Sequence, residues 1–233
     1  MMWKWIALSL LALTLLVGVA GYSFLRTPVQ ASGPIQAVPL QTTDQPSSSV
    51  APMANGTTVF EIDPDQSEAR FIVDEVLRGQ PNTAVGATDQ VAGQIAVDPT
   101  QPQTAQVGTI LINARTLTTD DNQRNNALRR FILGTDEHEF ISFTPTAVSG
   151  LPMSASVGQA YRAQVIGQLA IRGVSREATF DTTVTPVSAN ELNGTATTTI
   201  RYADWDISIP QVPLVAGVSD QVRLELDFVA SVA

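Results

Sequence analysis

Polar and apolar residues alternate strictly from Gln221 to Phe228, close to the end of this chain. Successive side chains of a β-strand point to opposite faces, so an alternating segment presents one apolar face and one polar face. An α-helix would instead place its apolar residues three or four positions apart. The segment is therefore predicted to be a strand with one buried and one solvated face. The predicted buried face comprises Val222, Leu224, Leu226, Phe228 and Ala230.

The same period of two recurs along most of the chain after Thr57, and turn residues separate the alternating segments. Such a series of short strands is typical of an antiparallel sandwich or barrel. Strands are predicted at residues 58–62, 69–77, 83–87, 91–97, 107–113, 141–148, 161–171, 178–184, 192–200 and 221–230. Eight strands already suffice to close a small barrel, so the predicted fold class is all-β.

Two of the predicted inward faces mix bulky residues with the small residues Ala163, Gly167, Gly194 and Ala196. A small barrel is just wide enough to be filled by its own side chains or to hold one ligand. The small residues are therefore consistent with a cavity, and equally with the close approach of a large neighbouring side chain. The sequence leaves these two alternatives open.

One short helix is predicted to interrupt the strands. Asp120 or Asp121 can cap its N-terminus, and Gly134 can end it. The apolar positions at helical spacing, predicted to face the barrel, are Leu128, Phe131 and Ile132. A single amphipathic helix beside a barrel is expected to close one end or to cover an edge.

Residues 5–25 are apolar or small throughout, and no charge lies between Lys4 and Arg26. An apolar helix of about 20 residues crosses a bilayer, whereas a signal peptide needs a basic start, a shorter apolar run and a small-residue cleavage site. The sequence fits both descriptions, so residues 1–26 are predicted to be either a cleaved signal peptide or a transmembrane anchor. Both alternatives place the rest of the chain outside the cytoplasm. The expected location is extracytoplasmic, as a membrane-anchored, periplasmic or secreted protein.

Residues 27–56 are rich in Pro, Ser, Thr, Gln and Ala, and Asp44 is their only charged residue. A segment of this composition cannot bury enough apolar surface to offset the entropy lost on ordering. It is predicted to be a flexible, disordered linker. Residues 57–233 are predicted to form one domain of ordinary size.

The predicted domain carries 11 arginines, no lysine and 21 acidic residues, which gives a net charge of 11 − 21 = −10. Nucleic acid is therefore a poor partner for it. The chain has no cysteine, and His138 is its only histidine, so a zinc site and a nucleophile-base pair both lack their groups. We expect no catalytic residues, no metal site and no cofactor. A weaker enzyme hypothesis rests on Asp204 and Asp206, which lie beside Trp205, and on His138.

Five parts of this domain, taken in order, resemble the YceI-like proteins, a family of polyisoprenoid-binding, lipocalin-like barrels. They are residues 60–73 (FEIDPDQSEARFIV), 124–128 (RNNAL) with Phe131 and 140–143 (FISF), 167–180 (GQLAIRGVSREATF), 201–205 (RYADW) and 218–222 (VSDQV). Two departures concern histidines. The family often has His-Ser after the first Asp, where this chain has Gln66-Ser67, and Arg-Asp-x-His-Leu in the helix, where it has RNNAL. A polar contact from those histidines to a ligand is not carried over.

The resemblance implies an antiparallel lipocalin-like barrel whose apolar lumen holds a long isoprenoid or fatty chain. The partners expected are this lipid, the membrane through an uncleaved N-terminal segment, and a second copy of the chain as a candidate homodimer. The residues proposed to line the cavity are Phe71, Val73, Tyr161, Val165, Leu169, Phe180, Leu224, Leu226 and Phe228. The alternative is an envelope-tethered structural or protein-interaction module with a solid barrel, in which the same residues are ordinary core.

Overall fold

The structure is a computed structural model that describes residues 32–40, 56–210 and 215–233. The predicted signal peptide or anchor lies outside the described residues, as does most of the predicted linker. No helix within the described residues is long and apolar enough to span a membrane. Residues 32–40 form neither helix nor strand, and the Leu40 N–H donates a hydrogen bond to Gln94 Oε1 (3.1 Å).

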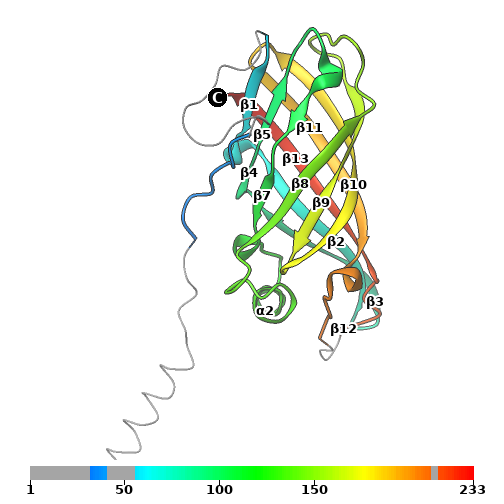
Figure 1. The fold of residues 1–233 in the computed structure, drawn as a ribbon. Coiled ribbons are helices and arrows are strands. Elements are labelled where there is room, and N and C mark those ends of the chain that lie inside the picture. Colours follow the sequence, from blue (N-terminus) through cyan, green and yellow to red (C-terminus); the bar gives the residue numbers. More distant parts are fainter. Residues whose placement is uncertain (1–31, 41–55, 211–214) are drawn as a thin grey trace, which may run out of the picture. The chain divides into compact units, whose positions relative to one another are not determined.

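From Thr58 onward the described chain forms an antiparallel sheet, which confirms the predicted all-β class (Figure 1). Its strands are β1 (Thr58–Ile62), β2 (Glu68–Leu77), β3 (Gln80–Thr88), β4 (Val91–Ala92), β5 (Gln94–Val97), β6 (Gln106–Val107), β7 (Ile110–Asn113), β8 (Phe140–Ser149), β9 (Tyr161–Ile171), β10 (Val174–Ser188), β11 (Glu191–Arg201), β12 (Val215–Ala216) and β13 (Gln221–Val232). Two predicted strands, 91–97 and 107–113, are each split in two, because their halves pair with different neighbours. The short strand β12 was not predicted.

The sheet closes on itself through the run from Val91 to Val97. The first half of this run, β4, pairs with β7, and the second half, β5, pairs with β1 on one edge and β6 on the other. Between the halves, the Ile62 N–H donates to the Gly93 carbonyl oxygen (2.9 Å). The other strands follow in the order β7, β8, β9, β10, β11, β13 and β1. The sheet therefore returns to its starting strand and forms the predicted lipocalin-like barrel.

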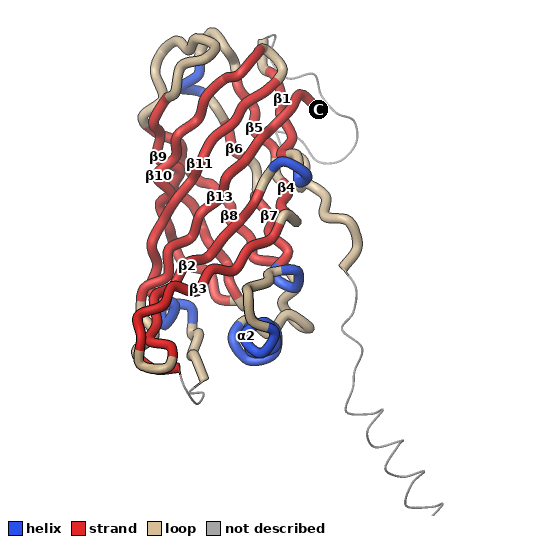
Figure 2. The backbone as a smooth tube through the Cα atoms, turned by 180° about the vertical axis from the view of Figure 1, so that it is seen from behind, coloured by secondary structure: helices blue, strands red, loops and turns tan. Residues whose placement is uncertain are grey.

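One end of the barrel is surrounded by three elements that come from distant parts of the chain. The β2–β3 hairpin extends toward this end, and the helix α2 (Asn122–Ala127) lies there too (Figure 1, Figure 2). The third element is the 3-10 turn η5 (Tyr202–Trp205) with β12, which pairs with Val76 and Leu77 of β2. We call this the helix end of the barrel.

The inward glycines accommodate aromatic rings. A methyl group at Gly194 would lie 2.4 Å from the Thr183 carbonyl oxygen and 2.7 Å from Phe228 Cζ. One at Gly167 would lie 2.4 Å from the Thr144 carbonyl oxygen and 2.9 Å from Phe143 Cζ. All four distances are too short for ordinary van der Waals contact, so only glycine leaves room for the neighbouring backbone and the ring. At Gly167 and Gly194, the small residue therefore reflects the close approach of a large neighbouring side chain and not a cavity. Ala163 and Ala196 instead border the empty space described below.

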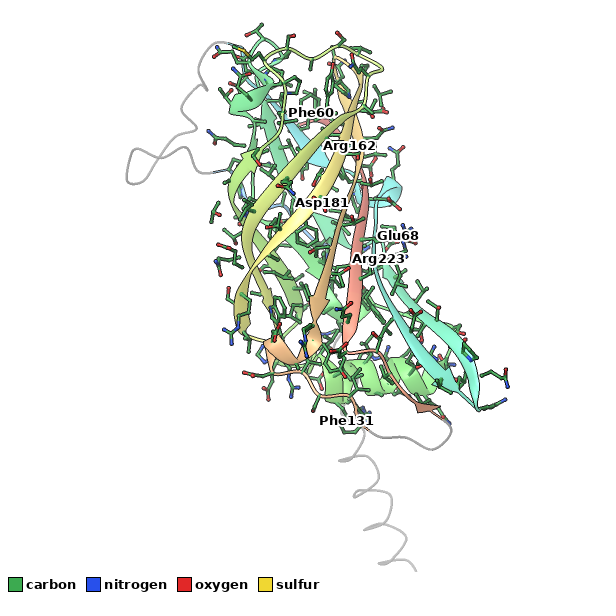
Figure 3. The ribbon with its side chains drawn as sticks, turned by 90° about the vertical axis from the view of Figure 1, so that its right-hand side faces the viewer. Phe60, Glu68, Phe131, Arg162, Asp181 and Arg223 are labelled. Atoms are coloured by element: carbon green, nitrogen blue, oxygen red, sulfur yellow. The ribbon has the colours of Figure 1, made fainter. Side chains whose placement is uncertain are left out.

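The helix begins as predicted and then departs from the expected spacing. Asp121 is its N-cap, and the turn after Ala127 is a π-helix at Leu128–Ile132, in which the Leu133 N–H donates to the Leu128 oxygen (2.8 Å). A π turn takes one residue more than an α turn, so the buried face moves along the sequence. Leu128 and Leu133 are buried, whereas Phe131 is 63% exposed. The prediction that Phe131 faces the barrel is wrong, and Figure 3 shows it on the outer side of the helix.

Replacing Phe131 with alanine should change the free energy of unfolding by no more than about 0.5 kcal/mol, because its ring is mostly in water. Replacing Leu128 with alanine, by contrast, should cost about 2–3 kcal/mol, because it leaves a cavity in the core. Chemical denaturation followed by circular dichroism measures both. If Phe131→Ala destabilised the protein as much as Leu128→Ala, the π turn would be misplaced.

Candidate functional site

The barrel encloses a cavity of about 780 Å³. This volume lies within the range of small-molecule binding sites, roughly 300–1,000 Å³. Its wall is built mainly from the inward residues of the long strands and is apolar over most of its length. The barrel is therefore hollow, and the solid-barrel alternative does not fit the structure.

The nine residues proposed from the sequence all line this cavity. Val165, Leu169 and Phe228 are buried, while Phe71 and Tyr161 are half-buried. The remaining four are Val73, Phe180, Leu224 and Leu226. Their contact with a ligand stays a prediction, since their position alone shows only where they lie.

Phe143 of β8 and Phe180 of β10 form an aromatic pair in the cavity wall. The rings of Phe143 and Phe180 have centroids 4.7 Å apart and an interplanar angle of 61°, which is an edge-to-face arrangement. Phe143 was not among the proposed lining residues. The sequence did carry a signal for it, because Phe143 lies in the predicted strand 141–148. In the structure it is buried in the same core.

The cavity is covered by loops at the end opposite α2. Pro102 and Ala105 come from the loop between β5 and β6, and Leu151, Pro152 and Ala155 come from the loop after β8. Pro102 is buried, and the other four are half-buried. These residues contribute apolar surface, so the described loops at the far end of the cavity offer no group that would hold a charge.

The cavity reaches solvent at the helix end. Among the described residues that line it, just four are exposed, namely Arg78, Asp120, Asp121 and Gln123. Arg78 lies at the β2–β3 turn, where its φ is +52°, and the others lie at the start of α2. We call the opening between these two elements the mouth. It is polar, in contrast to the wall behind it.

An ion pair lies just inside the mouth. Arg124 Nη2 is 2.8 Å from Glu75 Oε1, and Arg124 Nη1 is 2.5 Å from Asp120 Oδ1. Asn82 Nδ2 also donates to Glu75 Oε1 (2.9 Å). Glu75 is 7% exposed, and both Glu75 and Arg124 line the cavity. Arg124 therefore joins the helix to the β2–β3 hairpin across the opening.

Neither member of this ion pair was proposed from the sequence. Glu75 does carry a local signal, because it follows Phe71 and Val73 in the period-two register and must share their inward face. A carboxylate on an apolar inward face needs a partner, since burying an unpaired charge is costly. The identity of that partner was not visible, because Arg124 lies 49 residues away.

Asp121 holds the start of the helix at the mouth. Its Oδ1 accepts hydrogen bonds from the Gln123 N–H (2.7 Å) and the Arg124 N–H (2.9 Å). These bonds, first from Arg124 and then from Gln123, lower the pKa of Asp121 below its ordinary value. A carboxyl group with a lowered pKa stabilises the fold above its unfolded-state pKa, and this contribution is lost as the pH falls through the folded-state pKa.

The residues behind the enzyme hypothesis lie elsewhere. Asp204 and Asp206 are exposed at η5, and His138 lies near Gly173 in the β9–β10 turn. Among the described residues, none of these three lines the cavity. Within that same part of the chain, no group of three or more acidic or histidine side chains is placed to hold a metal ion.

A model of the YceI-like domain matches residues 60–230 of the chain. A search of curated proteins found no match to the chain. Among solved structures, a polyisoprenoid binding domain from Saccharophagus degradans, implicated in plant cell wall breakdown, superimposes with a TM-score of 0.61 at 14% identity, covering 76% of this chain and 99% of that one. BcnA of Burkholderia cenocepacia has a TM-score of 0.58 at 17% identity, covering 73% and 99%. The YCEI protein of Campylobacter jejuni has a TM-score of 0.52 at 17% identity, covering 64% and 84%. At these identities the likeness establishes the fold.

Proposed function

Because the chain belongs to the YceI-like family, we propose that its barrel binds or carries one apolar lipid, of the polyisoprenoid or fatty-chain type. The observation that carries this proposal is the enclosed apolar cavity of about 780 Å³. The fold shared with the polyisoprenoid binding domain from Saccharophagus degradans supports the same class of ligand. The proposal assigns the domain no catalytic step.

The hydrophobic effect alone accounts for useful affinity in such a cavity. Each buried methylene group contributes about 0.8 kcal/mol, so roughly ten of them contribute about 8 kcal/mol, the scale of a micromolar complex. Part of this free energy offsets the entropy that a flexible chain loses when it binds. A long apolar chain therefore suits this wall better than a compact polar molecule.

The proposed place of action is outside the cytoplasm. The support for it is the apolar run at residues 5–25, followed by a linker rich in proline, serine and threonine. If the run stays uncleaved, it tethers the barrel beside a bilayer, which is the source of an apolar ligand. If it is cleaved, the barrel carries the lipid as a periplasmic or secreted protein.

The test is to purify the protein from its own host, extract it with organic solvent and identify the extracted lipids by mass spectrometry. We expect one isoprenoid or fatty-chain species, at close to one molecule per chain. Native mass spectrometry of the unextracted protein should show the matching mass difference. If every preparation contained an empty barrel that also took up no prenyl alcohol, lipid binding would be ruled out.

A further inference from the structure

The mouth of the cavity carries more negative than positive side chains. Glu75, Asp120 and Asp121 contribute three carboxylates, while Arg78 and Arg124 contribute two guanidinium groups. All five side chains belong to the β2–β3 hairpin and the start of α2 with the residue before its cap. Any polar end of a ligand that emerges from the apolar cavity meets these groups.

The arginine nearest the cavity, Arg124, is engaged by carboxylates. Arg124 lies between Glu75 (2.8 Å) and Asp120 (2.5 Å), so its charge is already neutralised from two sides. Arg78, in contrast, is exposed at the β2–β3 turn, where water screens its charge. An arginine serves as a phosphate ligand when its guanidinium fork is free to bind the anion. At Arg124, a phosphate would have to displace a carboxylate and then lie beside it.

We propose that the mouth selects ligands whose polar end is uncharged, such as a prenyl or fatty alcohol, and rejects phosphorylated or carboxylate ends. This inference rests on the proposed function, because it concerns the polar end of the same lipid. Glu75 is buried, so an anion placed next to it would meet a like charge with little screening by water. The domain charge of 11 − 21 = −10 opposes an approaching anion in the same sense.

An uncharged hydroxyl finds a suitable partner at the mouth. Asn82 and Arg124 both donate to Oε1 of Glu75. Among the described side chains, no donor is placed on its other oxygen, Oε2. That oxygen can accept a hydrogen bond from a ligand hydroxyl without breaking the ion pair. The carboxylate of Glu75 therefore favours a hydroxyl end, which it accepts as a hydrogen-bond donor, over an anionic end, which it repels.

Two probes with the same prenyl chain test the inference, namely geranylgeraniol and geranylgeranyl diphosphate. Each is titrated against the full-length protein loaded with the fluorescent dye N-phenyl-1-naphthylamine, and the displaced dye gives the affinity. We expect the alcohol to bind at least about tenfold more tightly than the diphosphate. Diphosphate binding equal to or tighter than alcohol binding would overturn the inference and leave the proposed function intact. If neither probe displaced the dye, the proposed function itself would fail.

The variant Glu75→Gln tests whether the mouth causes the preference for the alcohol over the diphosphate. It should lower the ratio of the two affinities by about tenfold, whereas Glu177→Gln removes the same charge from the exposed face of β10 and should leave the ratio nearly unchanged. Melting temperatures verify that both variants are folded. If Glu75→Gln fails to fold, Asp120→Asn carries the test, with a smaller shift in the same direction because its side chain is 84% exposed. Equal ratios in Glu75→Gln and Glu177→Gln would show that the mouth does not select.

Discussion

Replacing Ala196 with phenylalanine is expected to weaken the binding of a prenyl alcohol by at least about tenfold. Ala196 lies on β11 between Thr182 of β10 and Leu226 of β13, and all three residues line the cavity. The added ring occupies space that the ligand would otherwise fill. Each methylene group excluded in this way removes about 0.8 kcal/mol, so the loss of two, about 1.6 kcal/mol, already exceeds tenfold.

The measurement is displacement of N-phenyl-1-naphthylamine by geranylgeraniol, together with the amount of lipid that co-purifies. Thr195→Phe is the matched control, because the neighbouring side chain of the same strand is exposed on the outer face. The control should bind like the wild type. Since the new ring of Ala196→Phe enters empty space, its melting temperature should stay close to that of the wild type. Undiminished binding by a folded Ala196→Phe protein would place the ligand elsewhere.

Replacing Trp205 with alanine is expected to destabilise the fold by about 3–5 kcal/mol. Trp205 is 3% exposed, and its indole Nε1–H donates to the Leu169 carbonyl oxygen on β9 (3.0 Å). It thereby fastens η5 to the barrel wall at the helix end. Ile207 and Ile209, which follow η5, line the cavity, so the same change should also weaken lipid binding.

Chemical denaturation followed by far-ultraviolet circular dichroism measures this loss, because removing the tryptophan also removes its fluorescence. Trp205→Phe separates the two contributions. It keeps most of the apolar volume but loses the indole donor, so we expect a cost of about 1–2 kcal/mol. A cost below about 1 kcal/mol for Trp205→Ala would contradict the buried position of this residue.

The sequence by itself determined the class of fold and the inward side of β2, β9, β10, β11 and β13. Both follow from a local rule, since neighbouring side chains of a strand point to opposite faces. This rule was sufficient to assign Val222, Leu224, Leu226 and Phe228 to one face, and to place all nine proposed residues in the cavity wall. The domain boundaries and the fate of residues 1–26 remain predictions.

The helix shows where local spacing ceased to be sufficient. Leu128, Phe131 and Ile132 fit one face of an α-helix, but the π turn adds a residue and brings Leu133 inward in place of Phe131. Spacing alone does not reveal such a turn, because the turn adds one residue to the α-helical period that the spacing assumes. The error therefore lies in the assumed period, although both ends of the element were predicted.

Only the tertiary structure decided whether the barrel is hollow and what stands at its mouth. Emptiness depends on the sizes of side chains that meet from strands far apart in sequence, and the rings beside Gly167 and Gly194 fill their sites while the space at Ala163 and Ala196 stays open. The mouth depends on Glu75 meeting Arg124 across 49 residues of chain. The period of two in the sequence predicts on which face of a strand a side chain lies. The cavity and its ion pair depend instead on which residues from distant parts of the chain the closed sheet brings together.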